Sequence, residues 1–377
     1  MGSAIAFNLA SLDPRLSIAV VERDPTYRTA SSALSVSSIR QQFSTPANII
    51  MSRYGMAFLK NVATHLAVGD LMPDIGLVER GYLYLATSAG QAVLRSNHDI
   101  QRQSDVDVAL LDSDEIARQF PWLATDDLAL GSLGLSGEGW FDGYSLLQAF
   151  RRKAQALGVR YITGEVAGFD LHGDCVDAVL LSDGTRIGCG KVVNAAGPHA
   201  RAIAAMAHVE LPVFAEKHCV FVFDCKDPPP ACPLVIDPSG LYFRPEGRYF
   251  LVGPPLLEGL TTDNSNLEVD LDLFDDVVWP TLAARVPAFE TIKRVNAWAG
   301  YYEMNAFDHN ALLGSAPEVP NLYFANGFSG HGMQQAPAAG LAIAELILFG
   351  EFRTLDLCAL SYHRLLRDEP LREINII

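Results

Sequence analysis

The sequence predicts a mixed fold that combines α/β and α+β parts, and three observations support this prediction. Residues 1–12 have helical periodicity, and a strand-like apolar run at 17–21 follows them. Five short strand patterns succeed one another between residues 159 and 194, as in a β-meander. An apolar run at 322–325 leads into a glycine-rich turn and a final helix. This order predicts two interleaved domains, because the chain has to cross between them more than once.

The first helix and strand correspond to the second half of a β-α-β unit. Ile5 and Leu9 form an apolar stripe that needs a central strand beneath it. We therefore expect a strand upstream of Met1, missing because the chain is a fragment or because its start was placed too late. In a dinucleotide-binding fold the last glycine of G-x-G-x-x-G opens this helix, and an acidic residue follows about twenty positions on. Gly2 and Glu22 have that separation. Glu22 would accept hydrogen bonds from ribose hydroxyls; the alternative is a solvated residue in a loop.

The middle of the chain alternates helices and strands. A serine-rich stretch at 26–52 leads into a helix, and Asp142 with Ser145 begins another helix, which Gly158 ends. The expected helices are at 48–62 and 146–157, with a further helix beginning at 112–115 and a helical piece at 272–285. The expected strands are at 81–86, 159–163, 166–171, 176–181, 186–188, 191–194 and 296–302. A second strand-rich block is expected to begin at 213–224 and end at 249–252.

Composition excludes several classes of protein. With 49% hydrophobic and 19% charged residues, the chain has the composition of an ordinary folded enzyme. Its net charge of -16 argues against nucleic-acid binding, which needs clustered Lys and Arg. No apolar run reaches the ~18 residues of a membrane span. The six cysteines are scattered, which predicts reduced thiols, no metal site and a cytoplasmic location.

The strongest local signal is Gly327-Phe-Ser-Gly-His-Gly-Met333, between a strand and a helix. Its glycines permit unusual backbone angles and the close approach of a planar ligand. Pro337 suits the first turn of the helix, whose free N–H groups would face that ligand. Asn194-Ala-Ala-Gly197 likewise has the small residues needed where a strand end passes under a nucleotide. Plain turns with small residues for packing are the alternative at both places.

Three side chains are candidates for contacts with a substrate. Arg40, between apolar Ile39 and Phe43, would clamp a carboxylate, or it is a surface or helix-capping arginine. Tyr302 would line a pocket or belong to the core. His331 would contact a ligand or serve the structure alone.

Five segments, in one order, carry a family resemblance: Leu34–Ser44, Glu138–Asp142, Pro287–Thr291, Trp298–Tyr302 and Gly327–Gly332. They resemble the D-amino-acid oxidase-like superfamily of FAD-dependent oxidoreductases over nearly the whole chain. Within it, the chain is most similar to the FAD-dependent oxidoreductase domain-containing proteins related to a mitochondrial assembly factor of respiratory complex I.

The resemblance implies a Rossmann-like FAD-binding domain, with its first strand missing, interleaved with a mixed-sheet substrate domain. The FAD-binding domain would comprise 1–60, 145–205 and 300–377, and the substrate domain 61–144 and 206–299. Carried over by position, the residues at the FAD site are Gly2, Ser3, Glu22, Arg23, Ser31, Ser32, Val166, Ala195, Ala196, Gly197, Gly300, Gly327, Ser329, Gly330, His331, Gly332 and Met333, and those at the catalytic site are Arg40, Tyr302, His331 and Gln334.

The chain departs from the family pattern at four positions. Gly300 stands where sarcosine oxidases bond FAD to a cysteine, which implies non-covalent FAD. Tyr302 replaces an arginine of glycine oxidases, and Gln334 replaces a lysine that closes the substrate clamp in sarcosine oxidases. Leu251 lies near the position at which sarcosine oxidases have the lysine that activates oxygen. Because a cation there would stabilise reduced oxygen, its loss favours a dehydrogenase over an efficient oxidase.

The expected function is oxidation of the C–N bond of a small amine, N-methyl amino acid or amino acid, by hydride transfer to flavin N5. The expected partners are this substrate and a protein electron acceptor or respiratory complex. For a cytoplasmic protein, the resemblance thus implies attachment to a respiratory membrane as a further option. A flavin-bearing assembly or interaction protein with little turnover is the alternative.

Overall fold

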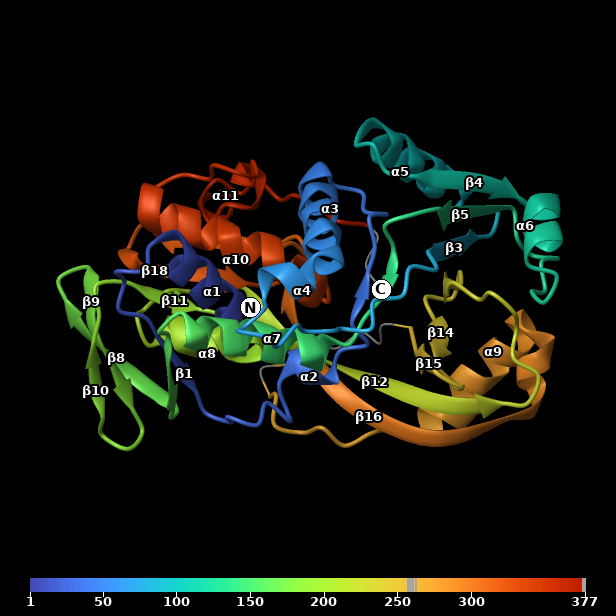
Figure 1. Ribbon diagram of the computed structural model, residues 1–377. Helices are drawn as coiled ribbons and strands as arrows, with labels where there is room; N and C mark the ends of the chain where they lie inside the picture. The colour runs from blue at the N-terminus through green and yellow to red at the C-terminus, as the bar shows by residue number, and fades with distance from the viewer. Residues whose placement is uncertain (256–260, 262, 375–377) are drawn as a thin grey trace.

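The largest sheet of the computed structural model lies towards one end of the molecule, and smaller sheets lie at the other end (Figure 1). The structure describes residues 1–255, 261 and 263–374. Residues 256–260 and 262 of the expected substrate domain, and 375–377 of the expected FAD-binding domain, lie outside the described residues.

The large sheet has eight strands in the order β16-β12-β15-β14-β13-β3-β5-β4. β13 and β3 run parallel, while the other neighbours run antiparallel. The strands are β3 (Tyr82–Ala86), β4 (Val108–Asp112), β5 (Leu130–Gly134), β12 (Val213–Cys225), β13 (Leu234–Ile236), β14 (Tyr242–Glu246), β15 (Tyr249–Gly253) and β16 (Ile292–Asn305). The helices connected with it are α5 (Gln91–Gln103), α6 (Ser113–Gln119), η2 (Phe274–Val278), α9 (Trp279–Arg285) and η3 (Pro287–Thr291).

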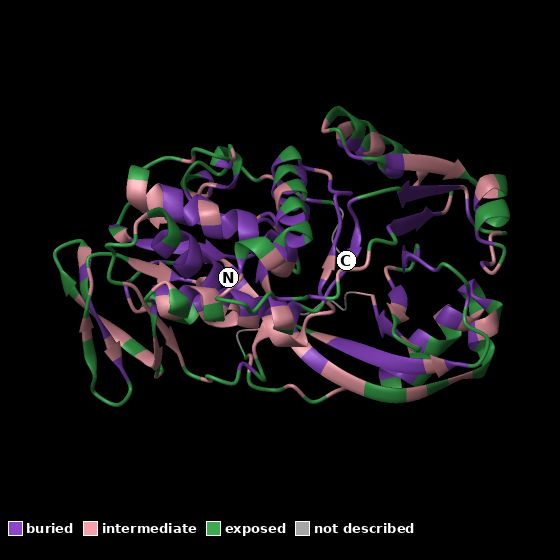
Figure 2. Ribbon diagram, viewed as in Figure 1, coloured by how far each residue is buried: buried purple, intermediate pink, exposed green. Residues whose placement is uncertain are grey.

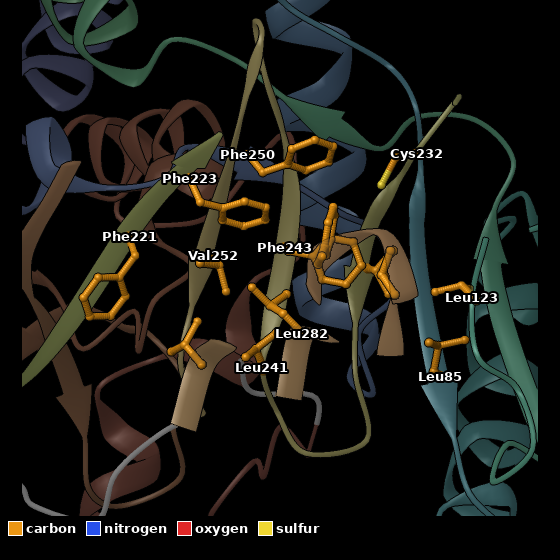
Figure 3. Packing of buried hydrophobic residues seen from close by; sticks show 14 of the residues in the cluster. Leu85, Leu123, Phe221, Phe223, Cys232, Leu241, Phe243, Phe250, Val252 and Leu282 are labelled. Carbon is orange, nitrogen blue, oxygen red and sulfur yellow. The ribbon is translucent and has the colours of Figure 1, made fainter. Parts of the chain in front are cut away.

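Aromatic rings fill the core between this sheet and α9 (Figure 3). Phe289 is fully buried, and its ring centroid lies 5.0 Å from that of Phe223, 5.4 Å from Phe243 and 5.1 Å from Phe250. Leu282 of α9 packs into the same cluster. The core therefore joins η3 and α9 to three strands of the sheet.

Two small parallel pairings hold the other end of the molecule. β1 (Ala19–Glu22) pairs with β7 (Arg160–Thr163), and β11 (Val192–Asn194) pairs with β18 (Val319–Asn326), whose other edge pairs antiparallel with β17 (Leu312–Ala316). Among the described residues, β1 and β11 each have one strand neighbour and leave their other edge without one.

Helices α1 (Gly2–Leu12) and α10 (Gly332–Phe349) pack closely over these sheets, with α3 (Pro46–Lys60) and α7 (Gly143–Ala156) beside them. A Cβ atom at Gly340 would lie 2.9 Å from the backbone of Ala4, so glycine permits this approach of α10 to α1. Both helices are largely buried, whereas the residues of β8 (Val166–His172) and β10 (Arg186–Gly188) are exposed or intermediate (Figure 2).

The predicted fold class is confirmed, with corrections in detail. The meander contains only β8 (Val166–His172), β9 (Cys175–Leu181) and β10 (Arg186–Gly188), because β7 and β11 pair with strands from the two ends of the chain. Asp142 accepts a hydrogen bond from the Ser145 N–H at 2.9 Å and begins α7 as expected. Pro337 lies inside α10, not in its first turn, so the free N–H groups belong to residues around Gly332.

The remaining elements are short. They are α2 (Ser31–Leu34), β2 (Ser38–Ile39), α4 (Val62–His65), β6 (Gly139–Trp140), η1 (Gly197–His199), α8 (Ala200–Ala205), η4 (Cys358–Leu360) and α11 (His363–Leu366). None of the helices that the structure describes is both long and apolar enough to cross a bilayer.

Candidate active site

Three distant parts of the chain meet around one cavity. Arg40 follows β2, Tyr302 lies in β16, and His331 and Gln334 lie at the start of α10; all four line the cavity. The predicted flavin-site residues Gly330 and Met333 line it as well. Tyr82 and Tyr242 complete its wall from the large sheet, at positions that the sequence did not indicate.

The guanidinium of Arg40 is buried, at 2% exposure, and held in a fixed orientation. Its Nη1 donates to the carbonyl oxygen of Gln42 at 2.7 Å, and its carbon lies 4.1 Å from the centre of the Phe43 ring. Its Nη2 lies 3.0 Å from Nε2 of His331. Arg40 is therefore not the surface arginine that the sequence left open.

The contact with Arg40 fixes the state of His331. Because a guanidinium only donates hydrogen bonds, Nε2 of His331 must accept, which places the ring proton on Nδ1. Burial holds the pKa of His331 well below its ordinary value, and the charges of Arg40 and His309 lower this pKa further. His331 is thus neutral, and Arg40 carries the positive charge of this wall.

Gln334 and Tyr302 frame the same wall. Oε1 of Gln334 accepts from the Arg40 N–H at 2.9 Å. The Tyr302 ring stacks on His218 at 3.8 Å between centroids, and burial raises the pKa of Tyr302 to about 12. A Cβ at Gly330 would lie 2.6 Å from the Tyr302 ring, so glycine is required where the turn passes this ring.

The glycine turn after β18 is anchored by a carboxylate that the sequence did not indicate. Gly327, Ser329 and Gly330 have φ angles of 71°, 48° and 88°, in the left-handed region. Oε2 of Glu303 accepts from the Gly327 N–H at 3.2 Å. Burial raises the pKa of Glu303 to about 7, although the hydrogen bond from the Gly327 N–H lowers it. A titratable acid therefore lies directly beside the predicted flavin turn.

The predicted nucleotide end forms a second group of contacts. Arg23, at the end of β1, lies 2.6 Å from Nε2 of His199 in η1, and a Cβ at Gly2 would lie 3.8 Å from Cβ of Ala195. Glu22 accepts from the Asp24 N–H at 2.9 Å. The structure thus brings the start of α1, the end of β1 and the turn after β11 together, but away from the lining of the Arg40 cavity. Other predicted residues outside that lining are Ser3, Ser31, Ser32, Val166, Ala196, Gly197, Gly300, Gly327, Ser329 and Gly332.

These residues fit a flavin nucleotide. The first turn of α1 has no side-chain cap, so its N–H groups suit an anion such as a pyrophosphate. The side-chain amide of Asn326, at the end of β18, is fully buried and makes no hydrogen bond of normal geometry. Hydroxyl and phosphate groups of such a ligand would supply partners for these N–H groups and for this amide.

The chain matches the sequence pattern of the family described as "FAD dependent oxidoreductase" over residues 1–346. It is 42% identical to the FAD-dependent oxidoreductase domain-containing protein 1 of Xenopus laevis, over the whole chain and 83% of that protein. It is 28% identical to glycine oxidase from Geobacillus kaustophilus, over 92% of the chain and 90% of that enzyme.

Among solved structures, L-proline dehydrogenase from P.horikoshii superposes with a TM-score of 0.85 and 25% identity, covering 98% of this chain and 96% of that one. The family pattern spans most of the sequence, and the L-proline dehydrogenase structure shares the fold over nearly the whole chain. The chain therefore belongs to the family of FAD-dependent oxidoreductases.

Proposed function

We propose that this protein oxidises the C–N bond of a small amino acid or N-methyl amino acid, with FAD bound non-covalently. The observation that carries the proposal is the cavity that Arg40, Tyr302, His331 and Gln334 line together. Gly300 has no side chain that could form a bond to the cofactor, which supports non-covalent binding.

Arg40 is proposed to bind the substrate carboxylate. A guanidinium matches a carboxylate in shape, and burial strengthens the interaction. Neutral His331 holds Nη2 of Arg40 through Nε2, and Gln334 holds its backbone. Tyr302 and Tyr242 would exclude water from the reacting carbon.

When bound, FAD supplies the oxidising power by accepting a hydride from the carbon beside the amine nitrogen. The nitrogen lone pair then closes a C=N bond, and water hydrolyses the imine to a carbonyl compound and an amine. A substrate bound as the neutral amine needs no general base from the chain.

The surroundings of Leu251 support a dehydrogenase. Leu251 is buried with Val220 and Val222 and offers no charge to stabilise reduced oxygen. Arg244 lies opposite it across the β14–β15 ladder, but its guanidinium pairs with the carboxylate of Glu246, which offsets its charge.

Anaerobic reduction of the bound flavin tests the proposal. Proline and sarcosine are compared with pyrrolidine and dimethylamine, the same amines without the carboxylate, and dimethylglycine and D-amino acids extend the panel. We expect loss of visible flavin absorbance with at least one acid and not with its decarboxylated partner. Arg40→Met should abolish that preference.

No reduction by any amine, together with a stable protein partner that purifies with the chain, would favour a flavin-bearing assembly protein. The replacement of two family cations by Tyr302 and Gln334 is the feature that favours this second function.

A further inference from the structure

The loop that carries Arg40 is irregular and buried. Residues 40–45 connect β2 to α3 outside any helix or strand, and Arg40, Gln41, Gln42 and Phe43 are each at most 8% exposed. Buried backbone N–H groups need acceptors, which a regular ladder would normally provide. In this loop the acceptors have to come from elsewhere.

Side chains from three distant regions accept most of these N–H groups. The Arg40 N–H donates to Gln334, as described above. The N–H groups of Gln41 and Gln42 both donate to Oε1 of Glu138, at 2.6 and 3.0 Å. The Ser44 N–H donates to Oε1 of Glu373 at 2.7 Å. Within the loop, the Phe43 N–H donates to the carbonyl of Gln41.

The carboxylates of Glu138 and Glu373 also accept hydrogen bonds from side chains of this loop. Oε2 of Glu138 accepts from Nε2 of Gln42 at 2.9 Å. A Cβ at Gly134 would lie 1.9 Å from this oxygen, so glycine at that position makes room for the carboxylate.

Glu373 lies in the C-terminal segment and is 2% exposed. It accepts from Oγ of Ser44 at 2.6 Å, Oγ1 of Thr45 at 3.0 Å and Nδ2 of Asn48 at 3.0 Å. It therefore ties the far end of the chain to the start of α3.

We infer that Glu138 and Glu373 are positioning residues that together set the guanidinium of Arg40 against His331 and the cavity. Neither carboxylate lines the cavity, so both act through the loop. The link is direct on one side, because Nη1 of Arg40 donates to the carbonyl of Gln42, whose own N–H is held by Glu138. On the other side Glu373 holds Ser44, the neighbour of the Phe43 ring on which the guanidinium stacks.

The inference deepens the proposed function, since it rests on that function for the task of Arg40. The geometry itself is tested without any substrate. The groups that face His331 are Arg40, the Phe43 ring and the more distant His309. A displaced guanidinium removes a neighbouring positive charge, so the His331 ring should become easier to protonate.

The experiment follows the His331 ring by ¹⁵N NMR in the purified holoprotein labelled on histidine, between pH 5 and pH 8. The signal is assigned with His331→Gln. In the unchanged protein we expect a neutral ring with an accepting Nε2 throughout. Glu138→Gln and Glu373→Gln each turn one acceptor oxygen into a donor, and we expect the pKa of His331 to rise by about one unit, a tenfold change in proton affinity.

Arg40→Met should give the largest rise in the pKa of His331. The control is Glu369→Gln, at an exposed position of the same C-terminal segment as Glu373, and it should leave this pKa unchanged. Gly134→Ala displaces Glu138 without altering its charge, and Ser44→Ala removes one donor to Glu373; both should shift the ring in the same direction. Folded Glu138 and Glu373 variants with a His331 ring like that of the unchanged protein would overturn the inference. It would equally fall if Arg40→Met left the ring unaltered. Failure of the amine panel with a positive result here would refute the proposed substrate and leave the positioning roles standing.

Discussion

Glu303 contributes to the pH dependence of this protein's stability, and Glu303→Gln should remove that contribution. The side chain is partly buried beside the glycine turn, and burial raises the pKa of its carboxyl group from 4.5 to about 7. In the unfolded chain the group returns to its ordinary pKa. Glutamine keeps an oxygen that can accept from the Gly327 N–H but does not titrate.

The sign and size of the effect follow from this shift. Because the folded pKa is the higher one, the folded state binds the proton more tightly, and stability is fully present below pH 4.5. This contribution to stability is lost as pH rises through about 7, because the buried Glu303 side chain of the folded protein then becomes a charged carboxylate. A shift of 2.5 units at 1.36 kcal/mol each gives about 3 kcal/mol, an upper bound because the carboxylate keeps some contact with solvent.

Urea unfolding at pH 5, 6, 7 and 8 measures the difference. The variant should exceed the free energy of unfolding of the unchanged protein by less than about 1 kcal/mol near pH 5 and by up to about 3 kcal/mol at pH 8. Glu165→Gln, at an exposed position, is the matched control and should give a pH-independent difference. A constant offset for Glu303→Gln across the series would refute the argument.

Two further predictions concern packing. Phe289→Ala should lower the free energy of unfolding by about 3–5 kcal/mol, because it removes a fully buried ring with three aromatic neighbours. Phe349→Ala, at a position that is 42% exposed, is the control and should cost well under half of that. Equal losses of the two variants in urea unfolding would contradict the buried role of Phe289. Gly340→Ala should lower the free energy of unfolding by about 1–3 kcal/mol, because the added Cβ forces α10 away from Ala4 of α1. Gly190→Ala, where nothing lies within 4 Å of the added Cβ, is the control and should be close to neutral. A neutral Gly340→Ala would show that α1 and α10 can separate freely.

Local elements could be predicted where the sequence carries their chemistry. Asp142 and Ser145 mark the start of α7 because the cap is a contact between near neighbours. The strand before Gly327 ends where expected, since its apolar run and the glycines are consecutive in the chain. Strand partners could not be predicted in the same way. The pattern at 192–194 is equally compatible with a meander and with a parallel neighbour, and only the fold pairs it with β18.

The sequence likewise indicated some residues of the candidate site and not others. Arg40, Tyr302 and His331 could be named because each lies in a segment that resembles the family, and Gln334 because it closely follows one. The structure brings all four to one cavity. Tyr242 had no such signal, since a tyrosine in a strand is most often a core residue. Pro337 misled the prediction of the helix start because proline is common in first turns but is also tolerated within a helix when neighbours compensate.

The acceptors around Arg40 show why a site can escape sequence patterns altogether. The contacts from Gln41 to Glu138, from Arg40 to Gln334 and from Ser44 to Glu373 span 97, 294 and 329 positions of the chain. No local preference of residues 40–44 specifies the loop, because the N–H groups of Arg40, Gln41, Gln42 and Ser44 have acceptors only when all three regions are in place. The loop should therefore order late in folding, as loop closure across most of the chain has to precede its hydrogen bonds. It follows that a ligand bound to Arg40 stabilises contacts at both ends of the polypeptide, so ligand binding at this cavity should protect the C-terminal segment around Glu373 from proteolysis.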